Sequence, residues 1–162
     1  MDTSSTLLGM GFLLLFIAPV AYVLIKEASK NKSQKKQFAQ LSKQHHLEFT
    51  QTEFFSNLSL GLDEMAKKLF VLTTGKSPRT LYIDLNTINS VELKNKYSHE
   101  GSVQRSIDDI SEISVNLKSR DKASGENKII FYGEDFHSVL QKEARLNSAQ
   151  KWNNLIQNTL KK

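Results

Sequence analysis

A long apolar run opens the pattern of hydrophobic and polar positions, at residues 7–25. Its nineteen residues include no charged or amide side chain, and the phenol of Tyr22 is their only hydroxyl. A helix of this length rises about 1.5 Å per residue, or roughly 28 Å in all, close to the ~30 Å hydrocarbon core of a bilayer. A helix packed on a soluble core would carry a polar residue at every third or fourth position. The run therefore predicts a transmembrane helix.

Removal of this run as a secretory signal is the alternative, and the flanking residues argue against it. A signal peptide has basic residues before a shorter apolar stretch and small residues at its cleavage site. Residues 1–6 contain no Lys or Arg, and the lysines follow the run instead. We expect the run to stay in the mature protein as an anchor.

The charges on either side of the run predict its orientation. The lysines that follow it are Lys26, Lys30, Lys32, Lys35 and Lys36. Glu27 alone opposes them, and Asp2 is the only charged side chain before the run. Because Lys and Arg near a span stay on the cytoplasmic side, residues 1–6 should lie outside and residues 26–162 inside. The sequence thus predicts a single-pass protein of the cell inner membrane with a cytoplasmic C-terminal domain.

Residues 26–46 predict a basic helical stalk next to the membrane. They contain neither Gly nor Pro, and Phe38, Leu41 and His45 recur at the i, i+3, i+7 spacing of one helix face. We expect this stalk to continue the membrane helix or to follow it after a short break. It should pack loosely, through Phe38 and Leu41, on a domain formed by residues 47–162.

From residue 47 on, apolar positions recur about every second residue, which is typical of β-strands. Strands are expected at residues 47–52, 57–63, 68–74, 80–86, 89–96, 111–118 and 128–133. In the second of these, three leucines alternate with Ser59, Gly61 and Asp63. Such alternation predicts antiparallel sheets with one face in water. The connections are too short for the helical crossovers that a parallel sheet needs.

An amphipathic helix is expected at the end of the chain. Its apolar stripe comprises Leu146, Ala149, Trp152, Leu155, Ile156 and Leu160. Asn147 or Ser148 is the expected N-cap, and the stripe should pack on a sheet. The predicted core of the domain combines this helix with the alternating strands. It comprises Leu81, Ile83, Leu85, Ile113, Val115, Leu117, Trp152 and Ile156.

Seven short antiparallel strands followed by one amphipathic helix resemble the pleckstrin-homology-like (PH-like) domain of bacterial membrane-anchored proteins. The matching segments within residues 57–160 are Leu60-Gly61-Leu62-Asp63-Glu64 before Lys67-Lys68-Leu69, Tyr82-Ile83-Asp84-Leu85 with Ile88, Val91-Glu92-Leu93, Ile129-Ile130-Phe131-Tyr132 and Ala149-Gln150-Lys151-Trp152. The resemblance implies an α+β fold. It implies that a mainly antiparallel β-roll of about seven strands, closed by the C-terminal α-helix, follows the transmembrane helix and the stalk. It also implies a position at membranes and binding rather than catalysis.

Most of the net charge of the chain lies beside the span, and Lys161 and Lys162 supply the rest. The formal charge is +5, yet residues 37–160 hold fifteen basic and fifteen acidic residues. Lysines next to a membrane gain about 1 kcal/mol each from anionic lipid, whereas binding of nucleic acid needs a basic patch on the folded domain. We expect the membrane as a partner and no nucleic acid.

A second set of basic residues falls on neighbouring predicted turns. These are Lys67, Lys68, Lys76 and Arg79. Together with the five lysines after the span, they are candidate contacts for lipid headgroups. The alternative is a solvated surface, because turns are usually charged and exposed. Asp63, Glu64 and Asp84 lie nearby in the sequence and would reduce the attraction to anionic lipid.

Patterns of catalytic or metal-binding residues are weak in this chain. It contains no Cys, which excludes disulfides, zinc–thiolate sites and thiol nucleophiles. His45 and His46 are adjacent and would point apart on a helix, which makes a poor chelating pair. Ser98, His99 and Glu100 are contiguous, whereas catalytic triads join distant positions. No phosphate-binding glycine loop, HExxH or GxSxG occurs, so we predict no enzyme, cofactor, metal or small-molecule substrate.

Three functions remain open to a membrane-anchored domain of this kind. It can bind a protein or peptide, through a free strand edge or between the sheet and the helix. It can contact lipid headgroups, or it can serve as a small accessory subunit of a membrane complex. Gly9 and Gly11 lack the GxxxG spacing of packed spans, which weakens the last of these. We favour protein or peptide binding, because the anchor already localises the domain.

Overall fold

The computed structural model describes residue 32 and residues 34–74, 78–98, 106–121, 125–133 and 141–162. The predicted transmembrane helix and the residues before it lie outside these ranges. Within the described part of the chain, no helix is long and apolar enough to cross a membrane. The anchor and its orientation therefore stay predictions.

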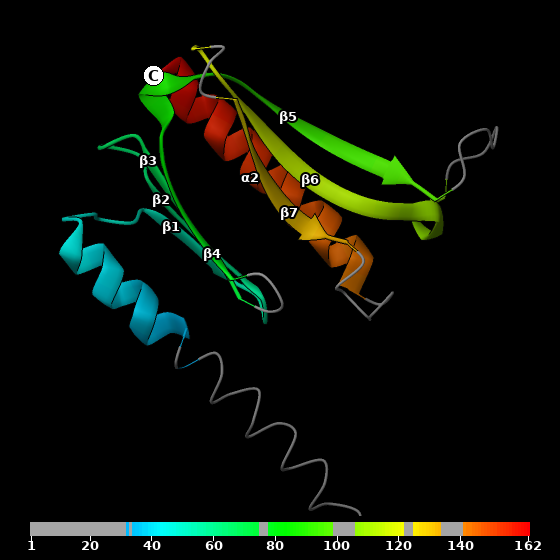
Figure 1. Cartoon of the computed structure of the whole chain (residues 1–162), viewed down its shortest axis with the longest axis horizontal. Coiled ribbons are helices and arrows are strands. Elements are labelled where there is room, and N and C mark those ends of the chain that lie inside the picture. Colours follow the sequence, from blue (N-terminus) through cyan, green and yellow to red (C-terminus); the bar gives the residue numbers. More distant parts are fainter. Residues whose placement is uncertain (1–31, 33, 75–77, 99–105, 122–124, 134–140) are drawn as a thin grey trace, which may run out of the picture.

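Two antiparallel sheets and a C-terminal helix form the domain (Figure 1). The four-stranded sheet contains, in spatial order, β1 (Gln51–Phe54), β2 (Leu58–Asp63), β3 (Lys68–Thr73) and β4 (Arg79–Asp84). The three-stranded sheet contains β5 (Ile88–Tyr97), β6 (Ile110–Ser119) and β7 (Glu126–Tyr132), followed by the helix α2 (Lys142–Lys161). The short 3-10 helix η1 (Leu85–Thr87) joins the sheets, and η2 (Ile107–Asp109) precedes β6. The predicted α+β class, antiparallel pairing and terminal helix are confirmed.

The first strand differs most from its prediction at residues 47–52. β1 begins only at Gln51, and residues 47–49 are irregular. Leu47 is nevertheless buried, and the backbone N–H of Glu48 donates to Asp63 Oδ2 at 2.9 Å. A side chain rather than a neighbouring strand thus holds this segment. The alternation of apolar residues reports only which side chains point inward, so it cannot separate the two cases.

The strand predicted at residues 80–86 ends early, at Asp84. The Asp84 side chain accepts a hydrogen bond from the backbone N–H of Asn86 at 2.9 Å and caps η1. This turn leads the chain from the first sheet into the second. Leu85 is buried as expected, although it belongs to the 3-10 helix and not to a strand.

The main hydrophobic core joins both sheets and α2. Of the predicted core residues, Ile83, Leu85, Ile113, Val115, Leu117, Trp152 and Ile156 are buried, and Leu81 is half-buried against the same cluster. Trp152 is the largest buried side chain. Apolar area removed from water contributes roughly 25 cal/mol per Å², so these residues supply much of the driving force for folding. The predicted core is confirmed.

A helix over residues 34–44 covers the other face of the four-stranded sheet (Figure 1). The Phe38 side chain on this helix is only 2% exposed. The centroid of its ring lies 4.8, 5.3 and 5.2 Å from those of Phe49, Phe54 and Phe70. Aromatic pairs at these separations add to the stability that burial provides. The expectation of loose packing through Phe38 is therefore wrong, whereas the domain boundary at residue 47 stays a prediction.

The strand β2 is buried on both faces as a result. Ser59 is 0% exposed and Asp63 is 4% exposed, and Gly61 between them is also buried. The Asp63 carboxylate accepts hydrogen bonds from the backbone N–H groups of Glu48 and Ala66, at 2.9 and 2.8 Å. The predicted wet face of β2 is wrong, because alternation along one strand does not reveal a distant helix that covers the polar side.

The helix α2 begins earlier than the sequence suggested. It starts at Lys142, and Gln141 occupies the N-cap without a side-chain capping bond. Asn147 and Ser148 are interior helix residues, so the predicted N-cap is wrong. Ser148 Oγ donates instead to Glu53 Oε1 on β1, at 2.8 Å. The hydroxyl that suits a cap here makes a tertiary contact.

Candidate functional site

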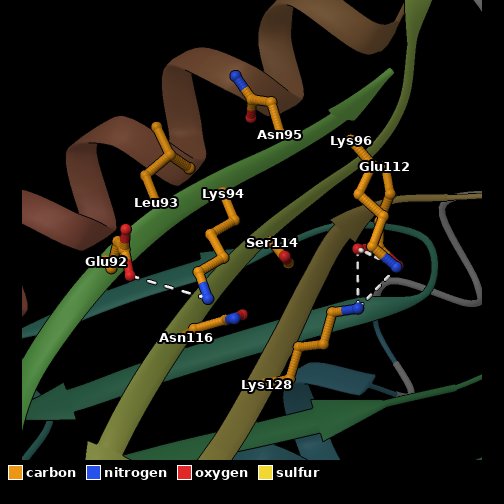
Figure 2. A pocket seen from close by; sticks show the side chains of 9 residues that line it. All are labelled: Glu92, Leu93, Lys94, Asn95, Lys96, Glu112, Ser114, Asn116 and Lys128. Carbon is orange, nitrogen blue, oxygen red and sulfur yellow. Dashed lines mark hydrogen bonds and ion pairs between the residues drawn. The ribbon is translucent and has the colours of Figure 1, made fainter. Parts of the chain in front are cut away.

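The three-stranded sheet turns one face toward α2 and the other face away from it. Leu93 and Asn95 on β5 point to the side of α2, whereas Glu92 and Lys94 point to the opposite side (Figure 2). Successive side chains of a strand alternate between its faces, so this arrangement follows from the sequence of β5. We call the face away from α2 the polar face.

A hollow of about 510 Å³ lies on the polar face. Its lining comprises Glu92, Leu93, Lys94, Asn95, Lys96, Glu112, Ser114, Asn116 and Lys128 (Figure 2). In the sheet register, Glu92 lies opposite Asn116, and Asn116 lies opposite Lys128. The volume falls in the range of pockets for small ligands, although those are mostly lined by apolar side chains.

Ion pairs connect the charged side chains of the hollow. Lys128 Nζ lies 2.7 Å from Glu112 Oε1 and 2.8 Å from Glu112 Oε2, and Lys96 Nζ lies 3.7 Å from Glu112 Oε1. Lys94 Nζ lies 3.8 Å from Glu92 Oε2. Three lysines and two glutamates leave a charge of +1 on the lining. Exposed pairs are worth only about 0–1 kcal/mol each, so the exposed lysines Lys94 and Lys96 can exchange their partners for an acidic ligand.

Two buried polar residues of β6 form the floor of the hollow. Ser114 is 1% exposed and Asn116 is 6% exposed. Asn116 Oδ1 has no hydrogen-bond partner among the residues described. A buried acceptor without a partner costs about 1–3 kcal/mol. Asn116 therefore offers an acceptor to a polar ligand.

The strand β5 is a ten-residue edge of its sheet. Within the described ranges it pairs with β6 alone, and a register shift at each end brackets its regular part. α2 packs beside it. Asn95 Oδ1 on β5 and Asn153 Oδ1 on α2 are shielded from solvent and have no hydrogen-bond partner in the part of the chain that the structure covers. The edge thus combines a row of backbone groups with side-chain acceptors.

The structure separates the candidate lipid contacts on the turns. Lys67 and Lys68 lie where β2 turns into β3, whereas Arg79 begins β4 and pairs with Thr73 at the other end of β3. A strand rises about 3.3 Å per residue, so Lys68 and Arg79 are roughly 17 Å apart along the strands. The expectation of one cluster is wrong for these three residues. Lys76 lies outside the described residues.

Acidic neighbours neutralise the charges near Lys67 and Lys68. Lys68 forms an ion pair with Asp84, and this hydrogen bond lowers the pKa of the Asp84 carboxyl. Lys162 Nζ likewise donates to Glu64 Oε2 at 2.9 Å and lowers the pKa of that carboxyl. This end of the four-stranded sheet is a poor match for anionic lipid.

The lysines after the predicted span have different charged surroundings from the lysines of the β2–β3 turn. Lys32, Lys35 and Lys36 are exposed at the start of the helix that covers the sheet, and Lys26 and Lys30 lie outside the described residues. Lys35 Nζ lies 5.6 Å from the ring centroid of Phe54. No acidic residue stands between Glu27 and Glu48. These lysines form an unopposed basic segment.

The sequence did not predict a set of hydrogen bonds that joins β1 to α2 through Glu53, which we call the polar joint. Glu53 accepts hydrogen bonds from Trp152 Nε1 at 2.6 Å, Ser148 Oγ at 2.8 Å and Lys151 Nζ at 3.3 Å. The partners stand 95–99 residues apart in the chain. No local pattern reports such a contact.

Arg145 is a second buried polar residue that the sequence did not reveal. Its Nη2 donates to Asn57 Oδ1 at 3.1 Å, and the guanidinium lies 3.9 Å from the ring centroid of Phe55. Burial lowers the pKa of Arg145 to about 10. The residue thus ties α2 to the turn between β1 and β2.

The described histidines, His45 and His46, lie where the helix over residues 34–44 ends. His45 stacks on Tyr82 with ring centroids 5.2 Å apart, and His46 adopts a φ of 51° where the helix ends. His99 and His137 lie outside the described ranges. In the portion of the chain that is described, no three His, Cys, Asp or Glu side chains gather as a metal site.

Comparisons with protein-family models, with curated proteins and with solved structures find no match to the chain. The class that the structure defines is an α+β domain of two antiparallel sheets and a terminal helix. Its candidate binding features are the hollow on the polar face and the β5 edge.

Proposed function

We propose that the chain is a non-catalytic interaction module with a PH-like fold. Residues 7–25 anchor it in the cell inner membrane, and the domain lies in the cytoplasm and binds a protein or peptide. The observation that carries the proposal is the β5 edge. Its ten residues pair with β6 on one side among the described strands. An extended segment of a partner can add to the other side as a further strand.

The order of the elements supports the PH-like assignment. Four strands form the first sheet, three strands form the second, and one helix follows. The helix packs on β5, β6 and β7, and its residue Trp152 reaches β1 through Glu53. A terminal helix that bridges the two sheets in this way closes a roll.

The two faces of β5 suggest the chemistry of the bound segment. Alternate side chains of an added strand would lie beside Lys94 and Lys96 on the polar face, and the others beside Leu93 and α2. Acidic and apolar residues in alternation would suit these neighbours. Each backbone hydrogen bond contributes about 0.5–1.5 kcal/mol net, and the ordering of a flexible segment opposes binding. A moderate affinity is expected.

The separation of the basic turn residues makes lipid-headgroup reading the weaker function for the domain alone. Lys68 is paired with Asp84, and Arg79 lies at the other end of the strands. The described basic residues of these turns, Lys67, Lys68 and Arg79, do not gather into the cluster that an anionic headgroup needs. A protein or peptide on β5 requires no such cluster.

Photo-crosslinking in native membranes tests the proposed partner site. A crosslinking amino acid replaces Lys94 on β5 in the full chain, and a matched control replaces Met65, which is 91% exposed on the β2–β3 turn. We expect a defined protein adduct from position 94 and none from position 65. Lys94→Glu with Lys96→Glu should weaken the adduct formed from a crosslinker at Asn89 without lowering the stability of the domain. Equal adducts from both positions would contradict binding along β5.

Replacement of the span separates the module from an accessory subunit. Residues 7–25 are exchanged for an unrelated apolar helix of the same length. The adduct from position 94 should persist, because the proposed contact belongs to the domain. Loss of the adduct in a folded, anchored chain would favour the subunit function.

A further inference from the structure

The helix over residues 34–44 fixes where the chain enters the domain. Gln34 is buried at its start, and the Gln34 Nε2 donates to Ser56 O and to Thr74 Oγ1, both at 3.0 Å. At the other end of the helix, His45 stacks on Tyr82. Contacts at both ends therefore tie the helix to the four-stranded sheet.

These contacts align the helix with the strands. Ser56 lies in the turn from β1 to β2, and Thr74 follows the last residue of β3. The Thr74 N–H donates to Asn57 O at 2.8 Å, which joins the two turns. We call this end of the sheet, with residues 55–57, 74 and 78–79, the proximal end. Figure 1 shows the helix beginning at the end of the sheet where β4 begins.

The opposite end of the sheet carries the turn from β2 to β3. Tyr82, the partner of His45, lies opposite Phe70 and two residues before the end of β4. Lys67 and Lys68 belong to this distal end. The helix thus runs from the proximal end, where the chain enters, to the distal end.

The middle of the helix is held as firmly as its ends. Phe38 packs among Phe49, Phe54 and Phe70, and it is almost fully buried. A helix fixed at three places along its length cannot swing freely on the sheet. The helix over residues 34–44 is therefore held rigidly on the sheet, and we call it the strut.

The exposed charges at the proximal end are basic. Lys32, Lys35 and Lys36 are exposed at the start of the strut, and Arg79 is exposed at the start of β4. Residues 28–47 contain no Asp or Glu. The distal end instead mixes both signs: it carries Lys67 and Lys68 beside Glu64 and Asp84, and Lys68 and Lys162 are ion-paired there.

We infer that the proximal end faces the bilayer and that Lys32, Lys35, Lys36 and Arg79 contact an anionic lipid surface. The strut holds the domain upright, so that Lys67 and Lys68 point away from the membrane. This inference rests on the proposed function, because it requires the anchor at residues 7–25 and a cytoplasmic domain.

Depth measurements on the full chain test this orientation. The chain contains no cysteine, so Thr80→Cys near the proximal end and Met65→Cys at the distal end each give one labelling site. Both residues are exposed. The labelled chain is inserted in vesicles of equal parts phosphatidylcholine and phosphatidylglycerol, and nitroxide lipids quench a fluorescent label according to its depth.

The label at position 80 should lie near the headgroups. The label at position 65 should lie farther away by on the order of 15 Å, because most of the length of a six-residue strand separates the sites. Equal depths, or a deeper label at position 65, would overturn the orientation. In vesicles of phosphatidylcholine alone, the label at position 80 should move outward. An unchanged depth there would overturn the contact with anionic lipid.

Two variants test the strut itself. Phe38→Ala removes its central contact, and Gln34→Ala removes the hydrogen bonds to Ser56 and Thr74 while leaving the aromatic rings in place. Each should reduce the difference in depth between the two labels, while the fluorescence of Trp152 verifies that the domain is folded. If both variants fold and their two labels still differ in depth as much as in the parent chain, the role of the strut is overturned.

Extraction with alkaline carbonate distinguishes failure of the inference from failure of the proposed function. A chain that leaves the vesicles has no membrane anchor, and the proposed function then fails. A chain that stays in the vesicles with both labels at one depth keeps its anchor, and the orientation alone fails.

Discussion

Glu53 shows at the residue scale how one carboxylate can hold two distant elements together. It accepts hydrogen bonds from Ser148 and Trp152, and both of these residues are buried. Lys151 adds an ion pair at 3.3 Å, at the exposed rim. The carboxylate thereby satisfies polar groups that α2 would otherwise bury without a partner.

Substitution of this residue by alanine should be strongly destabilising. Glu53→Ala leaves the Trp152 N–H and the Ser148 hydroxyl unpaired, and each buried donor left alone costs about 1–3 kcal/mol. We expect a loss of about 2–4 kcal/mol in the free energy of unfolding, measured with urea on residues 34–162. Glu126→Ala, which removes only an exposed pair with Lys94, should change it by less than about 0.5 kcal/mol. Equal effects of the two substitutions would contradict the joint.

The ion pair of Asp84 with Lys68 predicts how stability depends on pH. Lys68 lowers the pKa of Asp84 below its ordinary value of 3.8. The contribution of the pair is therefore fully present above pH 3.8 and is lost as the pH falls through the lower, folded pKa. Urea midpoints of the parent protein should fall in this acid range, and those of Asp84→Asn and Lys68→Met should fall less. Parallel pH profiles would show that the pair contributes nothing.

At the element scale, the strut shows where the prediction from the sequence and the structure differ. It looked like a loosely attached stalk in the sequence, yet it buries Phe38 against three other rings and covers the polar side of β2. Gly61 permits this close packing. A Cβ at Gly61 would lie 2.6 Å from the Phe38 ring and 2.9 Å from Phe49.

A double-mutant cycle tests the contact between the strut and β2. Gly61→Ala should destabilise residues 34–162 by about 1–3 kcal/mol, because the added methyl forces the Phe38 ring to move. In the Phe38→Ala background the same change should cost at least about 1 kcal/mol less. Gly133→Ala is the control, because a Cβ there meets only Ile130 Cγ2, at 3.4 Å. Additive effects would indicate that the strut does not pack on Gly61.

Truncation offers a second test of the same element. Removal of residues 34–46 takes away Phe38 and uncovers Phe49, Phe54 and Phe70. Loss of a buried aromatic side chain costs about 3–5 kcal/mol. Residues 47–162 should therefore unfold at a lower urea concentration than residues 34–162 and should bind a hydrophobic dye. Matching midpoints would show that the strut is dispensable.

At the scale of the whole molecule, the proposed function makes the domain and its anchor one oriented unit. The strut connects them, and its basic start lies at the proximal end of the sheet. The β5 edge belongs to the other sheet. The proposed function thus combines a fixed position at a membrane with a site for a partner in one protein.

Chemical labelling of single cysteines should verify this topology. Met65→Cys is expected to resist a membrane-impermeant maleimide in intact cells and to react after permeabilisation, because the basic flank keeps the domain inside. Ser4→Cys, before the span, should react in intact cells. The reverse pattern would place the domain outside and refute the proposed compartment.

The periodic spacing of apolar residues made much of the fold predictable. The apolar residues of β6 and the stripe of α2 lie in the core as their periods indicated, because residues two apart in a strand, or three to four apart in a helix, share one face. The hollow on the polar face was not predicted, since Asn116 and Lys128 become neighbours only through strand pairing. The grouping of Lys67 with Arg79 failed for the same reason, because neighbouring turns can lie at opposite ends of a sheet.

The amino-acid sequence by itself determined the antiparallel α+β class, the strand and helix periods and the distribution of charge along the chain. Each of these is a property of consecutive residues. Only the tertiary structure decided that a helix covers the polar side of β2, that Glu53 holds Trp152, and that the strut enters at the proximal end. Those outcomes depend on contacts between residues far apart in the chain, which complementary shape and hydrogen bonding select and no local pattern reports.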